Sequence, residues 1–167
     1  MIIVCGLDTV QAQVDKHSVG RVISLLGPDT PHRNFTGVVP GQHLKLTFHD
    51  IIAPTEGFSG PQKSDAEKLV AFIEKWDRGN PLLIHCWAGI SRSTASAYTA
   101  LCMLRPRADE EELAQELRAA SPSATPNRLI ISYTDALLGR QGRMSRAIEK
   151  IGRGENAYEG KPFILKP

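Results

Sequence analysis

The segment HCWAGISRS, residues 85–93, holds a cysteine six positions before an arginine, with a glycine between them. It continues the apolar run PLLI and leads into a segment that is apolar on most sides, as in a buried helix. A short loop between a buried strand and a helix directs backbone N–H groups at one point, where the helix N-terminus adds partial positive charge. Gly89 allows the backbone to turn, and the guanidinium of Arg92 can donate to two oxygens at once. The segment therefore predicts a site for an oxyanion, and phosphate fits it better than carboxylate.

The cysteine of this segment, Cys86, is the candidate nucleophile. The donors that bind an oxyanion also stabilise a thiolate, because cysteines near cations and helix N-termini ionise readily. A lone free cysteine is usually a small buried residue. Here His85 precedes the cysteine, Ser93 follows the arginine, and the setting is strand, loop and helix. This combination favours a sulfur that attacks the phosphorus of a bound ester.

Such chemistry needs an acid that protonates the leaving oxygen and then, as a base, activates water. Asp50 ends the expected strand HLKLTFHD, residues 43–50, and lies 36 positions before Cys86. The carboxyl ends of parallel strands share one edge of a sheet, so we expect Asp50 to lie near the cysteine. Asp65 suits the first turn of a helix, and Asp29 suits a turn. These two residues, or no acid at all, are the alternatives.

HCWAGISRS resembles the signature loop of the cysteine-dependent protein phosphatases, in which His-Cys is followed by five residues and then by Arg and Ser or Thr. Within that superfamily, AGISRS and the later segment TPNRLIISYTDALL resemble the compact dual-specificity phosphatases. The similarity covers roughly residues 21–138. The chain lacks the Trp-Pro-Asp that the large tyrosine-specific members carry on a mobile acid loop, and the compact branch often lacks it too.

The resemblance implies a role for each matching residue. Cys86 would form a phosphocysteine, and Arg92 would bind phosphate and stabilise the transition state. Ser93 would donate to the sulfur as it leaves, and His85 would fix the loop and tune the thiolate. Asn127 would support the loop, although a helix-capping role is equally open. The implied phosphate-binding loop (P-loop) comprises Trp87, Ala88, Gly89, Ile90, Ser91 and Arg92.

The activity that the resemblance implies is hydrolysis of phosphotyrosine in a phosphorylated protein, with phosphoserine or phosphothreonine as further substrates. A second hypothesis keeps the chemistry and replaces the substrate by a phosphoinositide or an RNA 5′-phosphate. Related phosphoinositide phosphatases tend to carry lysines in the loop, and WAGIS has none. A third hypothesis is a non-catalytic module that binds phosphoproteins. A sulfurtransferase is a less favoured hypothesis. No metal or cofactor is implied, because an arginine, backbone donors and an acid suffice.

Several elements must position these residues. Strands alternate with helices along the chain, which predicts a single α/β domain with a central, mostly parallel sheet flanked by helices. The resemblance makes this a protein-tyrosine-phosphatase-like fold of the compact dual-specificity type. Ser64 and Glu67 form the pattern of a helix capping box. The expected strands cover residues 1–7, 21–27, 43–50 and 81–85, and the expected helices cover residues 8–20, 64–76, 91–104, 109–120 and 126–138.

The pattern weakens after residue 138, which divides the chain into a phosphatase domain, residues 1–138, and a basic C-terminal extension, residues 139–167, packed on or trailing from that domain. The extension holds seven Lys or Arg against three Glu. It could contact an acidic partner or be a solvated segment. It has no dense basic run, so nucleic acid is an unlikely partner.

The three cysteines and the absence of a leader or a membrane-length apolar run predict a monomeric cytoplasmic protein with reduced thiols. Burial accounts for Cys5 and Cys102. A protective disulfide between one of them and Cys86 is a further hypothesis.

Overall fold

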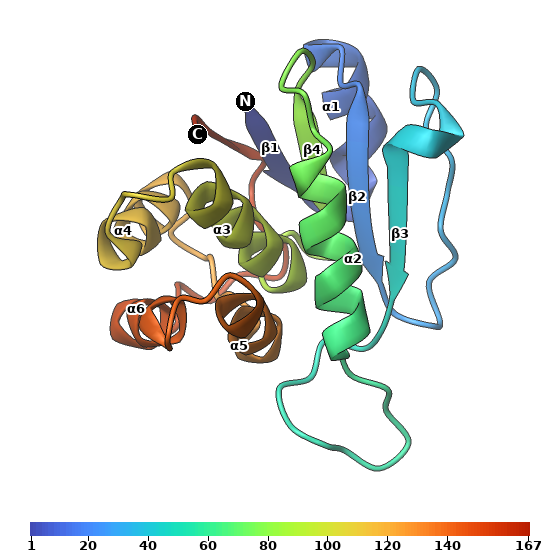
Figure 1. Cartoon of the computed structure of the whole chain (residues 1–167). Helices are drawn as coiled ribbons and strands as arrows, with labels where there is room; N and C mark the ends of the chain where they lie inside the picture. The colour runs from blue at the N-terminus through green and yellow to red at the C-terminus, as the bar shows by residue number, and fades with distance from the viewer.

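Five strands form one sheet in the order β3-β2-β4-β1-β5 in the computed structural model of residues 1–167 (Figure 1). The first four strands in the chain pair in parallel, and the last pairs antiparallel at the edge. The expected α/β fold with a mostly parallel sheet is confirmed. The strands are β1 (Ile2–Cys5), β2 (Arg21–Leu26), β3 (His43–Thr47), β4 (Leu82–His85) and β5 (Phe163–Leu165).

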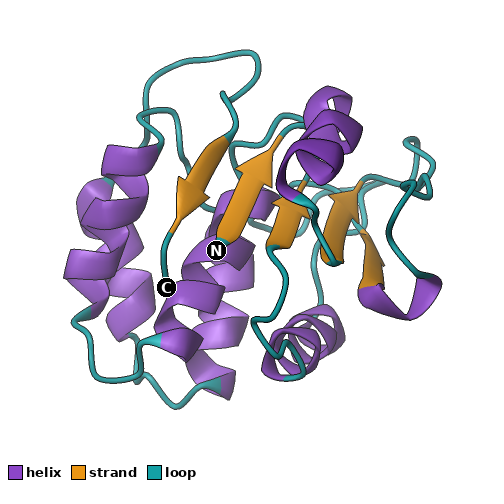
Figure 2. Ribbon diagram, turned by 90° about the horizontal axis from the view of Figure 1, so that it is seen from above, coloured by secondary structure: helices purple, strands orange, loops and turns teal.

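Helices cover both faces of the sheet, as Figure 2 shows from above. The first helix lies alone on one face, and the other five pack on the opposite face. None of the helices is both long enough and apolar enough to cross a lipid bilayer. The helices are α1 (Val10–His17), α2 (Lys63–Glu74), α3 (Arg92–Leu104), α4 (Glu110–Ala120), α5 (Arg128–Leu137) and α6 (Arg143–Ile151), with short 3-10 segments at Leu7–Thr9 and Pro40–Gln42.

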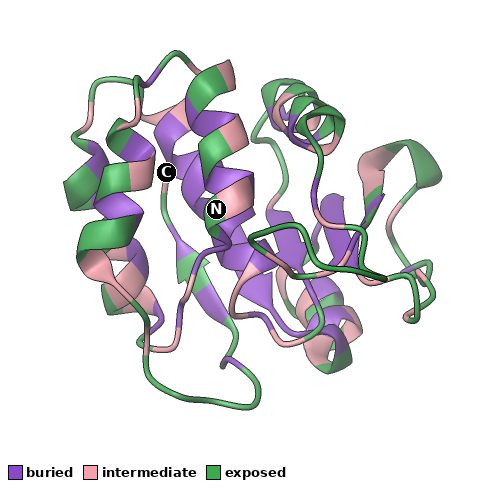
Figure 3. Cartoon of the chain, turned by 90° about the horizontal axis from the view of Figure 1, so that it is seen from below, coloured by how far each residue is buried: buried purple, intermediate pink, exposed green.

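The sheet separates two hydrophobic cores because successive side chains of a strand point to opposite faces. In β1, Val4 belongs to the larger core under α2 to α6, and Ile3 belongs to the smaller core under α1. The central strands β1, β2 and β4 are buried along their whole length, which explains their nearly continuous apolar sequences (Figure 3).

Two expected boundaries are wrong in detail. The strand predicted to reach Asp50 ends at Thr47, because the N–H of His49 turns away to the carbonyl of Ser59 at 2.7 Å. Asp50 therefore lies on the following loop. The capping box predicted for Ser64 and Glu67 does not form, because α2 begins earlier, at Lys63.

At the actual start of α2, the carboxylate of Asp65 accepts the N–H of Gln62 at 2.9 Å. Glu67 pairs instead with Lys63 on the surface, at 3.7 Å. The capping acid therefore lies two positions before the expected one.

Residues 139–167 contribute α6 and β5, two elements that the sequence analysis did not predict. Their basic side chains pair with the acidic start of α4. Arg140 lies 2.9 Å and Arg143 3.1 Å from the carboxylate of buried Glu110, and Lys150 pairs with Glu111. Part of the positive charge of this segment is therefore neutralised within the chain.

Candidate active site

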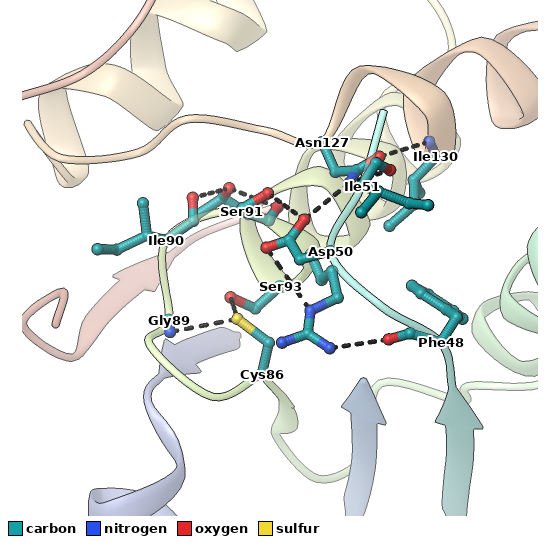
Figure 4. Close-up of polar contacts among 12 residues, drawn as sticks. Phe48, Asp50, Ile51, Cys86, Gly89, Ile90, Ser91, Ser93, Asn127 and Ile130 are labelled. Atoms are coloured by element: carbon teal, nitrogen blue, oxygen red, sulfur yellow. Dashed lines mark hydrogen bonds and ion pairs between the residues drawn. The ribbon is translucent and has the colours of Figure 1, made fainter. Parts of the chain in front are cut away.

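The residues between β4 and α3 form a tight turn at the carboxyl edge of the sheet, which we call the cysteine loop (residues 86–91; Figure 4). The short buried strand β4 ends at His85 and delivers Cys86 to this edge. Gly89 has a φ of 73°, in the left-handed region. A Cβ at that position would lie 2.7 Å from the backbone carbonyl carbon of Cys5. Both facts require glycine there.

The carbonyl groups of the cysteine loop accept hydrogen bonds from donors outside the loop. A planar trans peptide points its C=O and its N–H in opposite directions, so carbonyls bound on the outside leave N–H groups on the inside. The loop thereby keeps the conformation of an anion cradle. The bonds are Cys86 O with His85 Nδ1 (3.2 Å), Trp87 O with Leu7 N (2.9 Å), Ala88 O with Gly160 N (2.8 Å), Ile90 O with Thr125 N (2.9 Å) and Ser91 O with Asn127 N (3.3 Å).

The sulfur of Cys86 lies at the floor of this loop, and the residue is only 2% exposed. The N–H of Gly89 donates to Sγ at 3.2 Å. The hydroxyl of Ser93, on the first turn of α3, lies 3.2 Å from the same sulfur. Hydrogen-bond donors and a helix N-terminus both favour the anionic form of a thiol. The sulfur thus lies within reach of two hydrogen-bond donors at the start of α3.

The guanidinium of Arg92 is buried beside the loop. Its Nη1 donates to the carbonyl of Phe48 at 3.0 Å, which fixes the plane of the group. Its Nε lies 3.7 Å from Oδ2 of Asp50 and donates a hydrogen bond to no protein atom, although it is buried. An unpaired buried N–H is costly. This donor is therefore suited to an anionic ligand.

Asp50 is the carboxyl side chain that the structure brings to the loop. Its Oδ1 accepts the hydroxyl of Ser91 at 2.7 Å and the amide of Asn127 at 2.8 Å. Of the alternatives weighed from sequence, Asp65 caps α2, and Asp29 lies on an exposed turn after β2. Figure 4 shows the carboxylate of Asp50 held above the cysteine loop by these two partners.

Asn127 links the acid to the start of α5. Its Nδ2 donates to Asp50 and also to the carbonyl of Ile51 at 3.2 Å. Its Oδ1 accepts the N–H groups of Leu129 at 3.0 Å and Ile130 at 3.1 Å, which is a helix cap. Asn127 thus caps α5 through its oxygen and holds Asp50 beside the loop through its nitrogen, because a primary amide offers donors on one atom and an acceptor on the other.

Beneath the loop, His85 begins a chain of hydrogen bonds that the sequence analysis did not anticipate. Its Nδ1 faces a carbonyl, so this nitrogen carries the proton and Nε2 is an acceptor. That Nε2 lies 2.6 Å from Oγ of Ser24, which in turn lies 2.7 Å from Nε2 of His43. Burial lowers the pKa of His85 and of His43 to about 4, so both rings are neutral at neutral pH. The one available signal was a serine within the apolar strand RVISLL.

The other two cysteines are buried, and Cys5 lies next to the cysteine loop as the sheet partner of His85. Cys5 packs in the smaller core and Cys86 in the larger core, on opposite faces of the sheet. Cys102 lies in the buried part of α3. Burial raises the pKa of Cys5 and of Cys102 to about 12, so both are thiols at neutral pH. A disulfide between one of them and Cys86 remains a prediction.

Two grooves meet at the cysteine loop, and Ser91 and Thr125 line both of them. One, of about 490 Å³, is bounded by residues 153–158. The other, of about 460 Å³, follows residues 50–55 and the start of α5. Arg153 lies in the first groove and Arg128 in the second, and both are exposed and pair with no protein group.

The loop residue Trp87 is 44% exposed at the outer rim. Its ring centroid lies 5.4 Å from that of Tyr158, a residue of the C-terminal segment. Sequence reasoning missed the residues that the C-terminal segment brings to the loop, because nothing in their types suggested chemistry.

The fold and the position of the cysteine loop within it define a class, the compact dual-specificity type of the protein tyrosine phosphatase fold. The predicted fold is confirmed by solved structures. The crystal structure of DUSP15 superposes with a TM-score of 0.62 at 19% identity and covers 93% of this chain and 94% of its own. Human DUSP28 gives 0.61 at 21% identity, covering 83% of this chain and 94% of that chain.

PTPMT1 gives a TM-score of 0.59 at 16% identity and covers 85% of this chain and 94% of its own. A second structure of that protein holds PI(5)P. No family model and no curated protein sequence matches the chain. At these identities the likeness establishes the fold.

Proposed function

We propose that this protein is a cysteine-dependent phosphatase that hydrolyses phosphotyrosine in proteins, and phosphoserine or phosphothreonine as well, through a phosphocysteine intermediate. One observation carries the proposal. The sulfur of Cys86 receives the N–H of Gly89, while the buried Nε of Arg92 and the carboxyl of Asp50 lie 3.7 Å apart above the same loop. A nucleophile, an anion-binding donor and an acid thus converge at one point.

In the first step, the N–H groups of the cysteine loop and the guanidinium of Arg92 bind the phosphate oxygens. The sulfur of Cys86 attacks phosphorus, an S–P bond forms, and the bond from phosphorus to the ester oxygen breaks. Asp50 gives its proton to that leaving oxygen. The hydrogen bonds from Ser91 and Asn127 hold the carboxyl over the loop for this transfer.

In the second step, water replaces the departed alcohol or phenol. Asp50, now a carboxylate, takes a proton from the water as its oxygen attacks phosphorus. The S–P bond breaks, inorganic phosphate forms, and the electron pair returns to the sulfur of Cys86. The hydroxyl of Ser93, 3.2 Å from that sulfur, donates to the departing thiolate. The proton then held by Asp50 prepares the next turnover.

The grooves on both sides of Ser91 support a peptide substrate. An extended peptide could place its phosphorylated side chain in the cysteine loop and its flanking residues in the two grooves. The unpaired Arg128 and Arg153 would then favour acidic flanking residues. A phosphoinositide is the second candidate, because PTPMT1, a structural neighbour, is solved with PI(5)P. An RNA 5′-phosphate and a binding role without turnover are lower in rank.

The variant Cys86→Ser tests the proposal. It should lose hydrolysis of an aryl phosphate and retain binding of a phosphopeptide, because a hydroxyl cannot replace the thiolate while the cradle remains. Cys102→Ala is the matched control, since it removes a buried thiol that contacts no part of the loop. Full activity of Cys86→Ser refutes the mechanism. Phosphate release from phosphopeptides, inositol lipids and 5′-phosphorylated RNA then identifies the substrate class.

A further inference from the structure

The C-terminal segment after α6 runs along the outside of the cysteine loop before it ends in β5. The N–H of Gly154 donates to Oγ1 of Thr125 at 3.1 Å, and the N–H of Glu155 donates to the carbonyl of Pro122 at 2.9 Å. Further along, the N–H of Gly160 donates to the carbonyl of Ala88 at 2.8 Å. The segment is thus bonded to the loop that holds the phosphate site.

Gly160 approaches the cysteine loop so closely that a side chain would not fit without displacement. The residue is buried, and a Cβ on it would lie 3.1 Å from the carbonyl oxygen of Gly89 and 3.4 Å from the side chain of Ile90. The absence of a side chain is therefore what allows the backbone N–H to reach Ala88.

The carbonyl of Ala88 and the N–H of Gly89 belong to the same peptide plane. Because this plane is rigid, the hydrogen bond on its carbonyl also fixes the direction of its N–H. That N–H donates to the sulfur of Cys86 at 3.2 Å. If the plane turned over, the carbonyl dipole would point at the sulfur and at any bound anion.

Within the loop, the hydrogen bond from the N–H of Gly89 to the sulfur is the one contact that opposes such a turn. Gly89 adopts a φ of 73°, and glycine occupies positive and negative φ about equally well. The backbone at Gly89 therefore adds little restraint of its own, and the carbonyl side of the plane is held from outside the loop by the N–H of Gly160.

We propose that Gly160 is a positioning residue of the active site, whose N–H keeps the Ala88–Gly89 peptide turned so that its own N–H faces Cys86 and the phosphate. The C-terminal segment is then part of the catalytic machinery. The inference rests on the proposed function only in naming phosphate as the anion.

The segment is anchored on both sides of Gly160. On the C-terminal side, β5 pairs with β1, with Phe163 opposite Val4. On the N-terminal side, the ring of Tyr158 packs against Trp87 of the loop. The strand β5 and the hydrogen bonds of Gly154 and Glu155 hold the segment at points outside the loop, and the contact of Tyr158 with Trp87 joins it to the loop itself.

The sharpest test removes the single donor and nothing else. Semisynthesis of the C-terminal segment can replace the amide before Gly160 by an ester, which deletes the N–H and keeps the backbone shape. The matched control is the same exchange at Lys161, whose N–H donates to no group. Both proteins are titrated with tungstate, an inorganic mimic of phosphate, and assayed on an aryl phosphate. Thermal unfolding of both is recorded to confirm that each is folded.

We expect the ester at position 160 to bind tungstate roughly three- to tenfold more weakly than the control, the usual effect of one lost hydrogen bond. The value of kcat/KM should fall by at least the same factor. Tungstate affinities that agree within about twofold would overturn the inference, because a merely structural bond would leave the cradle intact.

The same measurements distinguish a failure of the proposed function from a failure of the inference about Gly160. A wild-type protein that binds tungstate but hydrolyses no ester ends the proposed function, and the two tungstate affinities still decide the role of Gly160. A wild-type protein that binds no tungstate overturns both.

Discussion

Acid should destabilise the fold through His85, which lies directly beneath the cysteine loop. The side chain is fully buried. It donates to the carbonyl of Cys86 and accepts from Ser24, so the neutral ring satisfies both contacts. A second proton would place a charge in the core and a donor where an acceptor is needed. Burial accordingly lowers the pKa of His85 to about 4, from 6.5 in the unfolded chain.

Stability falls as the pH falls, because proton binding and folding are linked. Because the folded-state pKa of His85 lies below the unfolded one, the unfolded chain takes up the proton first as the pH falls. The stability that the neutral ring contributes is present above about pH 6.5 and is lost as the pH falls toward 4. The full difference corresponds to about 3 kcal/mol, and about 2 kcal/mol of it should be lost between about pH 7 and pH 5.

Urea unfolding at these two pH values measures the loss, with His85→Gln as the comparison. Glutamine is uncharged at both pH values and can still hydrogen-bond to Ser24, so its pH dependence should be smaller than that of the wild type by about 2 kcal/mol. Carboxylates titrate in both proteins and cancel in this difference. If the two proteins lose the same stability within about 0.5 kcal/mol, the assignment of a neutral buried ring is wrong.

Three further predictions test the acid, the grooves and the C-terminal packing. Asp50→Asn should lower kcat for a phosphotyrosine peptide by about 10²- to 10³-fold, and much less for p-nitrophenyl phosphate, whose leaving group needs little protonation. Equal losses on the two substrates would argue against an acid role. Arg128→Glu and Arg153→Glu should each lower kcat/KM for acid-flanked phosphopeptides by about two- to fivefold and leave p-nitrophenyl phosphate unaffected. An unchanged peptide preference would remove both arginines from the substrate site. Glu110→Gln leaves the buried guanidinium of Arg140 without its carboxylate and should cost about 3 kcal/mol in urea unfolding. A loss below about 1 kcal/mol would show that backbone acceptors suffice for this arginine.

Local sequence was enough to predict the cysteine loop. A short apolar strand, a cysteine, a glycine and an arginine followed by a helix form one contiguous unit, and both boundaries of that unit depend on near neighbours. Asp50 was also found, because parallel strands end at a common edge and only the exact end of β3 was misjudged. Its true end is set by a hydrogen bond between His49 and Ser59 across a loop.

The two elements of the C-terminal segment, α6 and β5, were not predicted by the sequence analysis. The helix α6 does carry an amphipathic pattern, with Met144, Ala147, Ile148 and Ile151 on one face, and the sequence analysis overlooked it. Ion pairs such as that of Arg143 with Glu110 also join it to α4. The strand β5 has only three residues and forms because β1 offers an open edge. A strand this short leaves no pattern within its own segment.

The sequence by itself determined the candidate site, because the cysteine, the arginine and the turn between them lie within seven consecutive residues. Only the tertiary structure decided what holds these residues in place. Ser24 and Gly160 are unremarkable in the sequence, and each contributes one hydrogen bond to the loop or to the histidine beneath it. Such contacts depend on the packing of segments far apart in the chain, which no local pattern of residue types records.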